Sequence, residues 1–175
     1  MLKRRETVMS EWNRRTHKPA TALHAAWGTY LGRLGWEWFV TLTFDEKHRS
    51  INKRLADREA FWWVTQLGRL FRKPVGWLYA VEQGSSGRVH VHVLVVGVGV
   101  GVSWSTPRAM WRTSNGIAHI QPVDNGRRVV LYTTKQAYKG GDIVLSDTLA
   151  RYLTQVRTHD MVDLCSELTK VGSEA

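Results

Sequence analysis

The sequence predicts an α+β fold, in which antiparallel strands pack against helices. Residues 75–83 are rich in Val, Trp and Tyr, and residues 88–96 alternate valine with other side chains; both patterns are typical of strands. Residues 84–87 (GSSG) separate these strands and have the composition of a hairpin turn. Residues 53–72 instead repeat apolar side chains at the i, i+3, i+4, i+7 spacing of an amphipathic helix.

The other elements follow from composition and spacing. Apolar residues recur at helical spacing over residues 19–34, and Gly35 is expected to end that helix. Residues 36–44 (WEWFVTLTF) are rich in aromatic and β-branched side chains and predict a strand. Further along, the expected elements are a helix at 103–112 capped by Ser105 or Thr106, a strand at 117–123, a helix at 124–139 capped by Asp124, an edge strand at 142–145 and a helix at 147–156.

No repeat or linker divides the chain, so residues 1–175 are expected to form one domain. Residues 1–18 are expected to be a basic arm that contacts phosphates, or else a frayed terminus, and residues 159–175 a weakly defined tail. Most of the helix at 53–72 is expected to be scaffold. Trp62 falls off its apolar stripe, which predicts either exposure or packing against a neighbouring segment.

The composition indicates a polyanion as the partner. Lysine and arginine number 25 against 15 acidic residues, which gives a formal net charge of +10. The nine tryptophans suit base stacking, although most tryptophans in any domain belong to its core. Cys165 is the single cysteine, so no internal disulfide can form and a reducing, cytoplasmic compartment is expected. No apolar run is long enough to cross a bilayer, so no membrane partner is expected.

Two histidines share one face of the strand at 88–96. Side chains alternate along a strand, so His90 and His92 point away from the face that carries the valines. If the hairpin pairs its two strands, Glu82 falls opposite His90, with the Cβ atoms about 5 Å apart. Two imidazoles and a carboxylate with open positions suit Mn²⁺ or Mg²⁺ when a substrate supplies phosphate oxygens. Each residue alone is equally well explained as an ordinary side chain of a half-buried strand.

Tyr132 and Lys135 stand three residues apart on the helix predicted at 124–139, so they share a face. A tyrosine hydroxyl attacks a phosphodiester only if the phosphorus is polarised and the transition-state charge is stabilised. A metal ion held by Glu82, His90 and His92 would act as a Lewis acid, and Lys135 would stabilise the phenolate or the developing phosphate charge. The product would be a 5′-phosphotyrosine with a free 3′-hydroxyl, and rejoining would need no ATP.

Two other functions fit the same residues. A basic α+β domain with aromatic strands can bind single-stranded nucleic acid by stacking, without catalysis or metal. A metal-dependent hydrolase would use water as its nucleophile and would release both ends. Tyr132 and Lys135, each taken alone, are ordinary interface and surface residues, so the order of the motifs carries the argument for a tyrosine nuclease.

This ordered set resembles the HUH endonuclease superfamily, specifically the rolling-circle replication initiators of plasmids and phages. The resemblance rests on residues 39–44 (FVTLTF), on His90-Val-His92 with Glu82 as the upstream acidic ligand, on residues 111–122, and on Tyr132-x-x-Lys135. It implies a central antiparallel sheet of about five strands flanked by helices, with a ferredoxin-like core. It also places both histidines on a middle strand.

The resemblance further implies nicking and joining of single-stranded DNA at an origin hairpin or nick site, with Mn²⁺ or Mg²⁺, no nucleotide cofactor and a separate helicase. DNA contacts are expected from Thr41, Thr43, Arg88, Lys139, Arg4, Arg5, Arg14 and Arg15. Gln136 stands where many relatives carry a second aromatic residue. A glutamine at this spacing is similar to single-strand transposases of the superfamily, where it helps to bind metal, so a transposase or a relaxase-like enzyme is an alternative.

Overall fold

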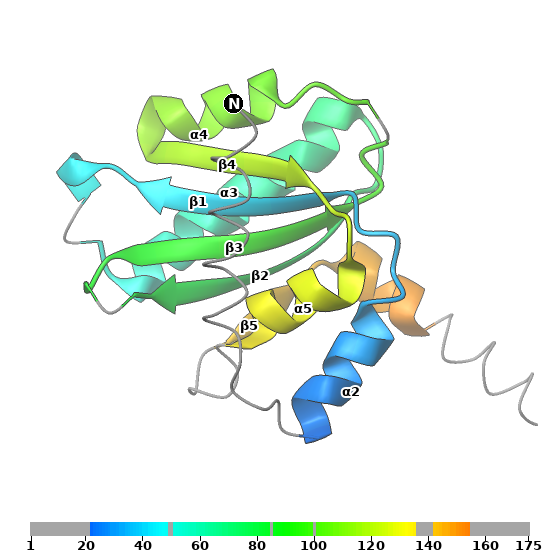
Figure 1. Cartoon of the computed structure of the whole chain (residues 1–175). Coiled ribbons are helices and arrows are strands. Elements are labelled where there is room, and N and C mark those ends of the chain that lie inside the picture. The colour runs from blue at the N-terminus through cyan, green and yellow to red at the C-terminus, as the bar shows by residue number, and fades with distance from the viewer. Residues whose placement is uncertain (1–21, 49–50, 85, 100, 136–141, 155–175) are drawn as a thin grey trace, which may run out of the picture.

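The computed structural model describes residues 22–48, 51–84, 86–99, 101–135 and 142–154 (Figure 1). The helices are α2 (Ala22–Leu31), α3 (Lys53–Phe71), α4 (Ser105–Ser114) and α5 (Gly126–Thr134), with a 3-10 turn η1 (Glu46–His48). The strands are β1 (Trp38–Phe44), β2 (Gly76–Gln83), β3 (Val89–Val96), β4 (Gly116–Pro122) and β5 (Ile143–Leu145). Residues 147–154 are also helical.

The five strands form one sheet in the order β4-β1-β3-β2-β5, and all neighbours are antiparallel. This confirms the predicted α+β fold, with β3 as the central strand and β5 at an edge. The β2–β3 hairpin closes with hydrogen bonds from the Gly84 N–H to the Arg88 carbonyl at 2.8 Å and from the Gly87 N–H to the Gly84 carbonyl at 3.0 Å. Gly87 has a φ of +78°, which glycine adopts without strain.

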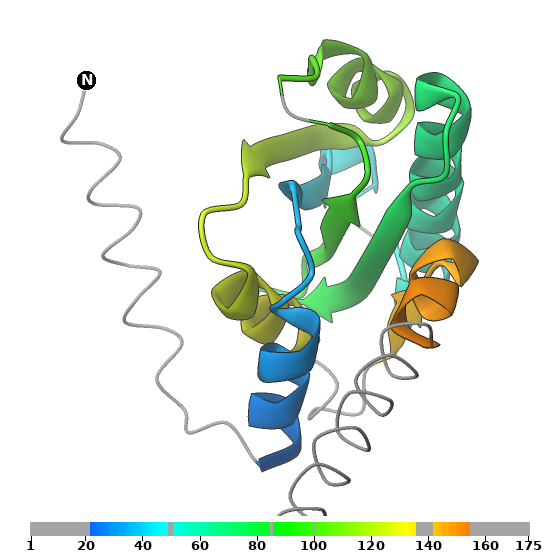
Figure 2. The same ribbon diagram turned by 90° about the vertical axis from the view of Figure 1, so that its right-hand side faces the viewer.

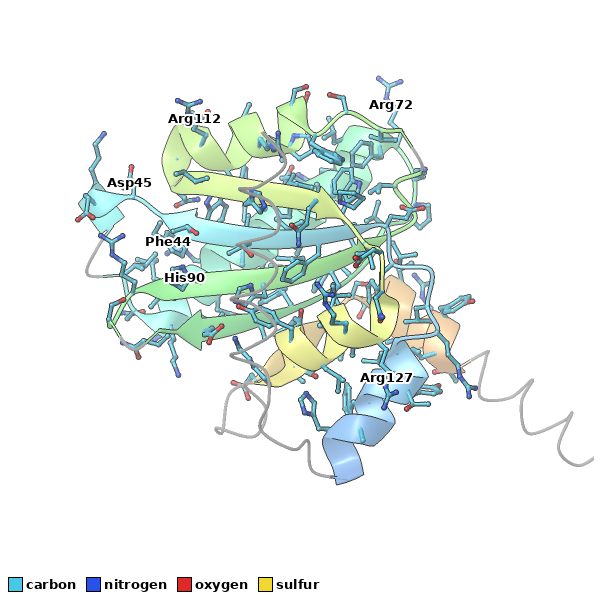
Figure 3. The ribbon with its side chains drawn as sticks, viewed as in Figure 1. Phe44, Asp45, Arg72, His90, Arg112 and Arg127 are labelled. Atoms are coloured by element: carbon cyan, nitrogen blue, oxygen red, sulfur yellow. The ribbon has the colours of Figure 1, made fainter. Side chains whose placement is uncertain are left out.

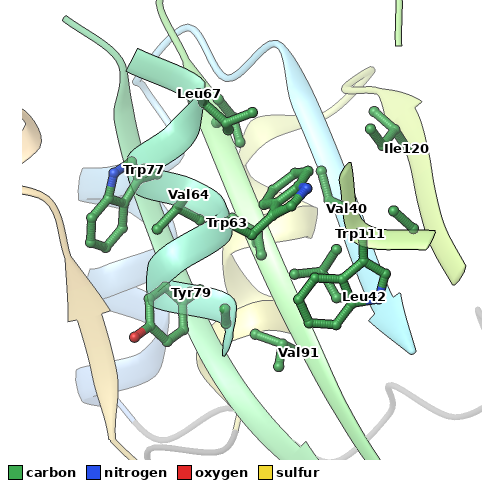
Figure 4. Close-up of a cluster of buried hydrophobic side chains, with 14 of the residues drawn as sticks. Val40, Leu42, Trp63, Val64, Leu67, Trp77, Tyr79, Val91, Trp111 and Ile120 are labelled. Carbon is green, nitrogen blue, oxygen red and sulfur yellow. The ribbon is translucent and has the colours of Figure 1, made fainter. Parts of the chain in front are cut away.

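One face of the sheet packs on α3 and α4 to form the larger core. The valine face of β3 lies wholly within this core, as the alternating pattern predicts. Trp63 on α3 and Trp111 on α4 are completely buried there (Figure 4). Their indole N–H groups donate to the carbonyls of Pro107 and Thr43 at 2.9 and 3.1 Å, so both buried indoles keep a hydrogen-bond partner.

The opposite face carries α2, α5 and the helical residues 147–154 (Figure 2). The second core contains Leu31, Trp36, Phe39, Leu78, Leu94, Val129, Val130 and Leu149. α5 lies over β3 and β2 and packs against α2. On β4 the alternate side chains Ile117, His119 and Gln121 are exposed, so this half of the face remains accessible beside α5.

The helix ends differ from the sequence predictions. Asn125, rather than Asp124, caps α5, and its side chain accepts a backbone N–H of the first turn at 3.0 Å. Trp104 precedes α4 in a helical conformation, so Ser105 and Thr106 lie inside the helix and make no cap. α5 ends at Thr134 instead of reaching residue 139, and residues 136–141 lie outside the described chain.

Side-chain exposure on α3 corrects one detail and settles another. Leu70, which the helical period places on the apolar stripe, is 37% exposed. At that end of α3, Phe71 packs edge-on against Trp38, with 5.7 Å between ring centroids. Trp62 is 45% exposed, which decides between the two possibilities left by its position off the stripe. Within the described residues, no helix combines the length and apolarity needed to cross a membrane.

Candidate active site

The two histidines of β3 lie in two parallel rows of side chains across the sheet. Glu82 on β2 stands directly opposite His90, as the hairpin length predicts, and Thr43 on β1 stands on the other side of His90. In the next row, His92 lies opposite Thr41. Glu82, both histidines and both threonines therefore belong to the sheet face that α5 partly covers, away from the valine core. Figure 3 shows His90 near the hairpin end of β3.

α5 carries Tyr132 onto this face. Its buried side chains include Val129, Val130 and Thr133, and Tyr132, on an adjoining part of the helix surface, is half-buried. The ring of Tyr132 meets the ring of His92 edge-on, with 4.8 Å between centroids and an angle of 74° between planes. A phenol and an imidazole that are distant in sequence are thus in direct contact.

α2 fixes the position of α5 through close backbone approach. A Cβ atom on Gly32 would lie 2.7 Å from the Cα atom of Arg127, a distance that side chains do not tolerate. The imidazole Nε2 of His24 on α2 lies 2.8 Å from the carbonyl of Leu131, next to Tyr132. The short loop from β4 and these helix contacts together hold the tyrosine over β3.

Glu82 is the hub of the site. Its Oε2 atom accepts the Nε2 of His92 at 2.8 Å and the Nζ of Lys135 at 2.9 Å, and the carboxylate is largely buried. Burial alone would raise the pKa of Glu82, but the hydrogen bonds and charge from His92 and Lys135 outweigh it and lower the pKa to about 2. The Nζ of Lys135 also lies 3.8 Å from the centroid of the Tyr132 ring, a cation–π contact.

The hydrogen bonds of His92 define its tautomer. Burial lowers its pKa despite the hydrogen bond to Glu82, so the imidazole is neutral at neutral pH. A neutral ring has one donor and one acceptor nitrogen. Because Nε2 donates to Glu82, Nδ1 accepts the hydroxyl of Thr41, which lies 3.3 Å away. The ring of Phe39 stacks on His92 at 5.8 Å and meets Tyr132 edge-on at 5.7 Å.

His90 is the least satisfied residue of the set. Its Nδ1 atom is buried and has no hydrogen-bond partner among the described residues. Burial also lowers the pKa of His90, so its nitrogen lone pair is available at neutral pH. A buried polar atom without a partner in a polar site is an observation that favours an additional ligand.

The arrangement fits a divalent ion in its chemistry, although the three side chains are not drawn together around one point. The donor set is one carboxylate oxygen and two imidazole nitrogens, and two of the three donors already meet at 2.8 Å. In the described part of the chain, however, no three His, Cys, Asp or Glu side chains are close enough to hold a metal ion. The assignment of Glu82, His90 and His92 as metal ligands stays a prediction.

The predicted DNA-binding residues separate into three sets. Thr41 and Thr43 lie on the site face, half-buried. Arg88 is exposed at the hairpin end and forms an ion pair with Glu46, so its charge is partly neutralised. The remaining candidates lie outside the described residues: Lys139, the metal candidate Gln136, and Arg4, Arg5, Arg14 and Arg15.

Two residues of the site were not predicted from sequence. Phe39 shares the parity of Thr41 and Thr43, and this was the available signal that it would face His92. His119, which sequence reasoning treated as an ordinary strand residue, is exposed on β4 directly opposite Thr41. His119, Thr41 and His92 thus form one row across three strands.

One family of known proteins matches most of the described chain. The family model for the replication-associated protein ORF2 group matches residues 37–141, which is more than half of the chain. The matched range includes Glu82, both histidines of β3, Tyr132 and Lys135. No curated protein and no solved structure matches.

Proposed function

Because the chain belongs to the replication-associated protein ORF2 family, we propose that it initiates replication by nicking single-stranded DNA and holding the cut end on Tyr132. We assign it to the HUH type of initiator found in plasmids and phages. One observation carries the proposal: the ring of Tyr132 contacts His92, 4.8 Å between centroids, beside the carboxylate that pairs with Lys135. A tyrosine buried for packing alone would not need a lysine and a carboxylate beside it.

In the proposed reaction, the phenolic oxygen of Tyr132 attacks a backbone phosphorus. A P–O bond forms to Tyr132, the bond to the 3′ oxygen breaks, and the proton lost by the phenol is balanced by the proton gained by the 3′-hydroxyl. The number of phosphoester bonds does not change, so the reverse attack by a 3′-hydroxyl rejoins DNA without ATP. Lys135 places a positive charge at the ring of Tyr132, where negative charge develops.

Glu82, His90 and His92 are the proposed ligands of Mn²⁺ or Mg²⁺. A bound ion would supply Lewis-acid stabilisation of the phosphate charge. The lowered pKa values of both histidines keep their nitrogens deprotonated, as metal binding requires. Thr41 fixes the ring of His92 through Nδ1, the role that outer hydrogen-bond partners play for metal-binding histidines.

The accessible half of the same sheet face is the proposed path of the DNA strand. α5 covers β3 and β2, whereas β4 exposes Ile117, His119 and Gln121 next to the two threonines of β1. Ile117 is 69% exposed, and such an apolar side chain beside a polar site suits contact with a base. Thr41 and Thr43 would lie between this strand path and the histidines.

The test is a search for a covalent adduct. The protein is incubated with Mn²⁺ and a random-sequence single-stranded DNA library, which removes the need to know the target, and adducts are isolated under denaturing conditions. We expect an adduct with the wild-type protein, none with chelator and none with Tyr132→Phe. Tyr152→Phe is the matched control, because Tyr152 is an exposed tyrosine on another helix and should react normally.

Other outcomes identify the competing functions. An adduct that survives Tyr132→Phe would place the nucleophile elsewhere. Cleavage without an adduct would indicate a hydrolase that uses water. DNA binding with neither cleavage nor adduct, with and without metal, would indicate a binding module. The sequence of the recovered DNA would distinguish a replication origin from the end of a transposon.

A further inference from the structure

We propose that the outer surface of α3 is a second binding surface for single-stranded DNA, on the side of the sheet opposite Tyr132. The surface consists of a basic–aromatic stripe, defined as Arg54, Arg58, Phe61, Trp62, Arg69 and Arg72. It does not depend on the nuclease proposal, since none of these residues approaches Glu82, the histidines or Tyr132. Figures 1 and 2 show α3 and α5 on opposite sides of the sheet.

The spacing of the stripe follows the helix. Steps of one or two helical turns, from 54 to 58, from 58 to 61 and 62, and on to 69 and 72, keep these side chains along one side of α3. The buried stripe, which includes Trp63 and Leu67, faces the sheet. A helix of 19 residues is about 28 Å long, so the stripe can contact several nucleotides of an extended strand. Figure 3 shows Arg72 projecting into solvent at one end of it.

Two aromatic rings are exposed in the middle of this stripe. Phe61 is 50% exposed and Trp62 is 45% exposed, whereas Trp63 between them and the sheet is completely buried. Phe61 is braced edge-on by Trp77, with 6.0 Å between centroids and an angle of 86°, so its orientation is fixed before any partner binds. Exposed, pre-oriented rings among cations are the arrangement that proteins use to stack bases while holding phosphates.

The charge of α3 favours a polyanion over a second copy of the chain. Both acidic residues of the helix are engaged: Asp57 accepts the hydroxyl of Tyr79 at 2.8 Å, and Glu59 pairs with Arg58 at 2.9 Å. The positive charges of Arg54, Arg69 and Arg72 remain exposed, and self-association through this surface would bring them together. An open hollow at the start of α3, lined by Arg54, Arg58 and Phe61 among others, lies beside the exposed rings.

The occupant we assign is single-stranded DNA, held without sequence preference. Duplex DNA hides its base faces and would leave Phe61 and Trp62 without the contact that explains their exposure. A surface of this kind would retain DNA near the protein whether or not the nick site occupies the candidate active site.

The test measures binding of the full chain to a fluorescent oligothymidine of about 16 nucleotides, near the upper site size of a single binding fold. Chelator is present throughout, so that cleavage does not interfere. We expect Trp62→Ala to weaken binding about ten-fold. The double variant Arg54→Ala/Arg69→Ala should lower the slope of log affinity against log salt by about 1.4, the value for two lost phosphate contacts.

Matched controls are an exposed aromatic residue and two exposed arginines away from the stripe. Tyr152→Ala and Arg33→Ala/Arg112→Ala should bind like the wild type, and thermal unfolding should show that each variant is folded. Unchanged binding by Trp62→Ala and by the stripe double variant would overturn the proposal. So would a change in oligomeric state caused by Trp62→Ala with DNA binding intact, because the stripe would then contact a second copy.

The two proposals fail separately. Tyr132→Phe should abolish the covalent adduct and leave oligothymidine binding unchanged, whereas Trp62→Ala should weaken that binding and still form the adduct. Loss of both properties in either variant would contradict the assignment of two surfaces.

Discussion

Replacing Lys135 with methionine tests how the buried Glu82 is stabilised. A folded-state pKa lowered from 4.5 to about 2 corresponds to about 3 kcal/mol of stability at neutral pH. His92 and Lys135 both contribute to that lowering, and the hydrogen bond from His92 would remain in the variant. We therefore expect Lys135→Met to lower the free energy of unfolding by about 1–2 kcal/mol at pH 7, or by about 5 °C in Tm.

The effect of this substitution should depend on pH in a defined direction. A carboxyl with a depressed pKa contributes stability that is fully present above its unfolded value of 4.5 and is lost as pH falls towards about 2. The difference between the wild type and Lys135→Met should therefore be largest at neutral pH and should shrink as Glu82 becomes protonated. Urea unfolding followed from pH 7 to about pH 3, with chelator present, measures it.

Lys47→Met is the matched control for the removal of one lysine charge, because Lys47 is exposed on η1 and far from Glu82 in the sheet. It should change stability by less than about 0.5 kcal/mol at every pH. If Lys135→Met costs the same at pH 3 as at pH 7, then Lys135 acts through its contact with the Tyr132 ring, and the reasoning from Glu82 is refuted.

Three further predictions concern the histidines and the core. Thr41→Val should weaken Mn²⁺ binding about ten-fold, measured by titration of the folded protein, because it removes the hydroxyl that orients His92; an unchanged affinity would contradict that role. Mn²⁺ binding should persist below pH 6.5, because burial lowers the pKa of His90 and His92 from that ordinary value; loss of binding at or above pH 6.5 would contradict it. Trp63→Ala should lower the free energy of unfolding by about 3–5 kcal/mol, whereas Trp62→Ala should change it by less than about 0.5 kcal/mol; equal effects would contradict the observed burial.

The parts of the site that could be predicted from sequence are those fixed by short-range geometry. The four-residue hairpin determines which residue of β2 stands opposite His90, so Glu82 was placed correctly before the fold was known. Side-chain alternation likewise assigned the valines of β3 to the core. The spacing of Tyr132 and Lys135 predicted a shared face, and Lys135 does lie over the Tyr132 ring.

The parts that could not be predicted depend on how distant elements pack. No local pattern indicates that Lys135 reaches Glu82, because that contact requires α5 to lie on β3 at the angle set by α2. The cap of α5 was misplaced by one residue, since Asp124 and Asn125 are both suitable caps and tertiary structure decides between them. The exposure of Trp62 was left open for the same reason: the period gives its direction, but only the fold shows that no neighbour covers it.

β3 explains how one small sheet can carry two independent surfaces. Its valine side chains and its histidine side chains point in opposite directions, so α3 packs on one face while Tyr132 meets the other. As the central strand it is bonded on both sides, which fixes the histidines more firmly than an edge strand would. The fully buried core beneath α3 lies between Trp62 and the site, without a shared polar partner. Substitutions on the two surfaces should therefore be additive, and a double variant of Trp62→Ala with Thr41→Val should show the sum of the separate effects within about 0.5 kcal/mol.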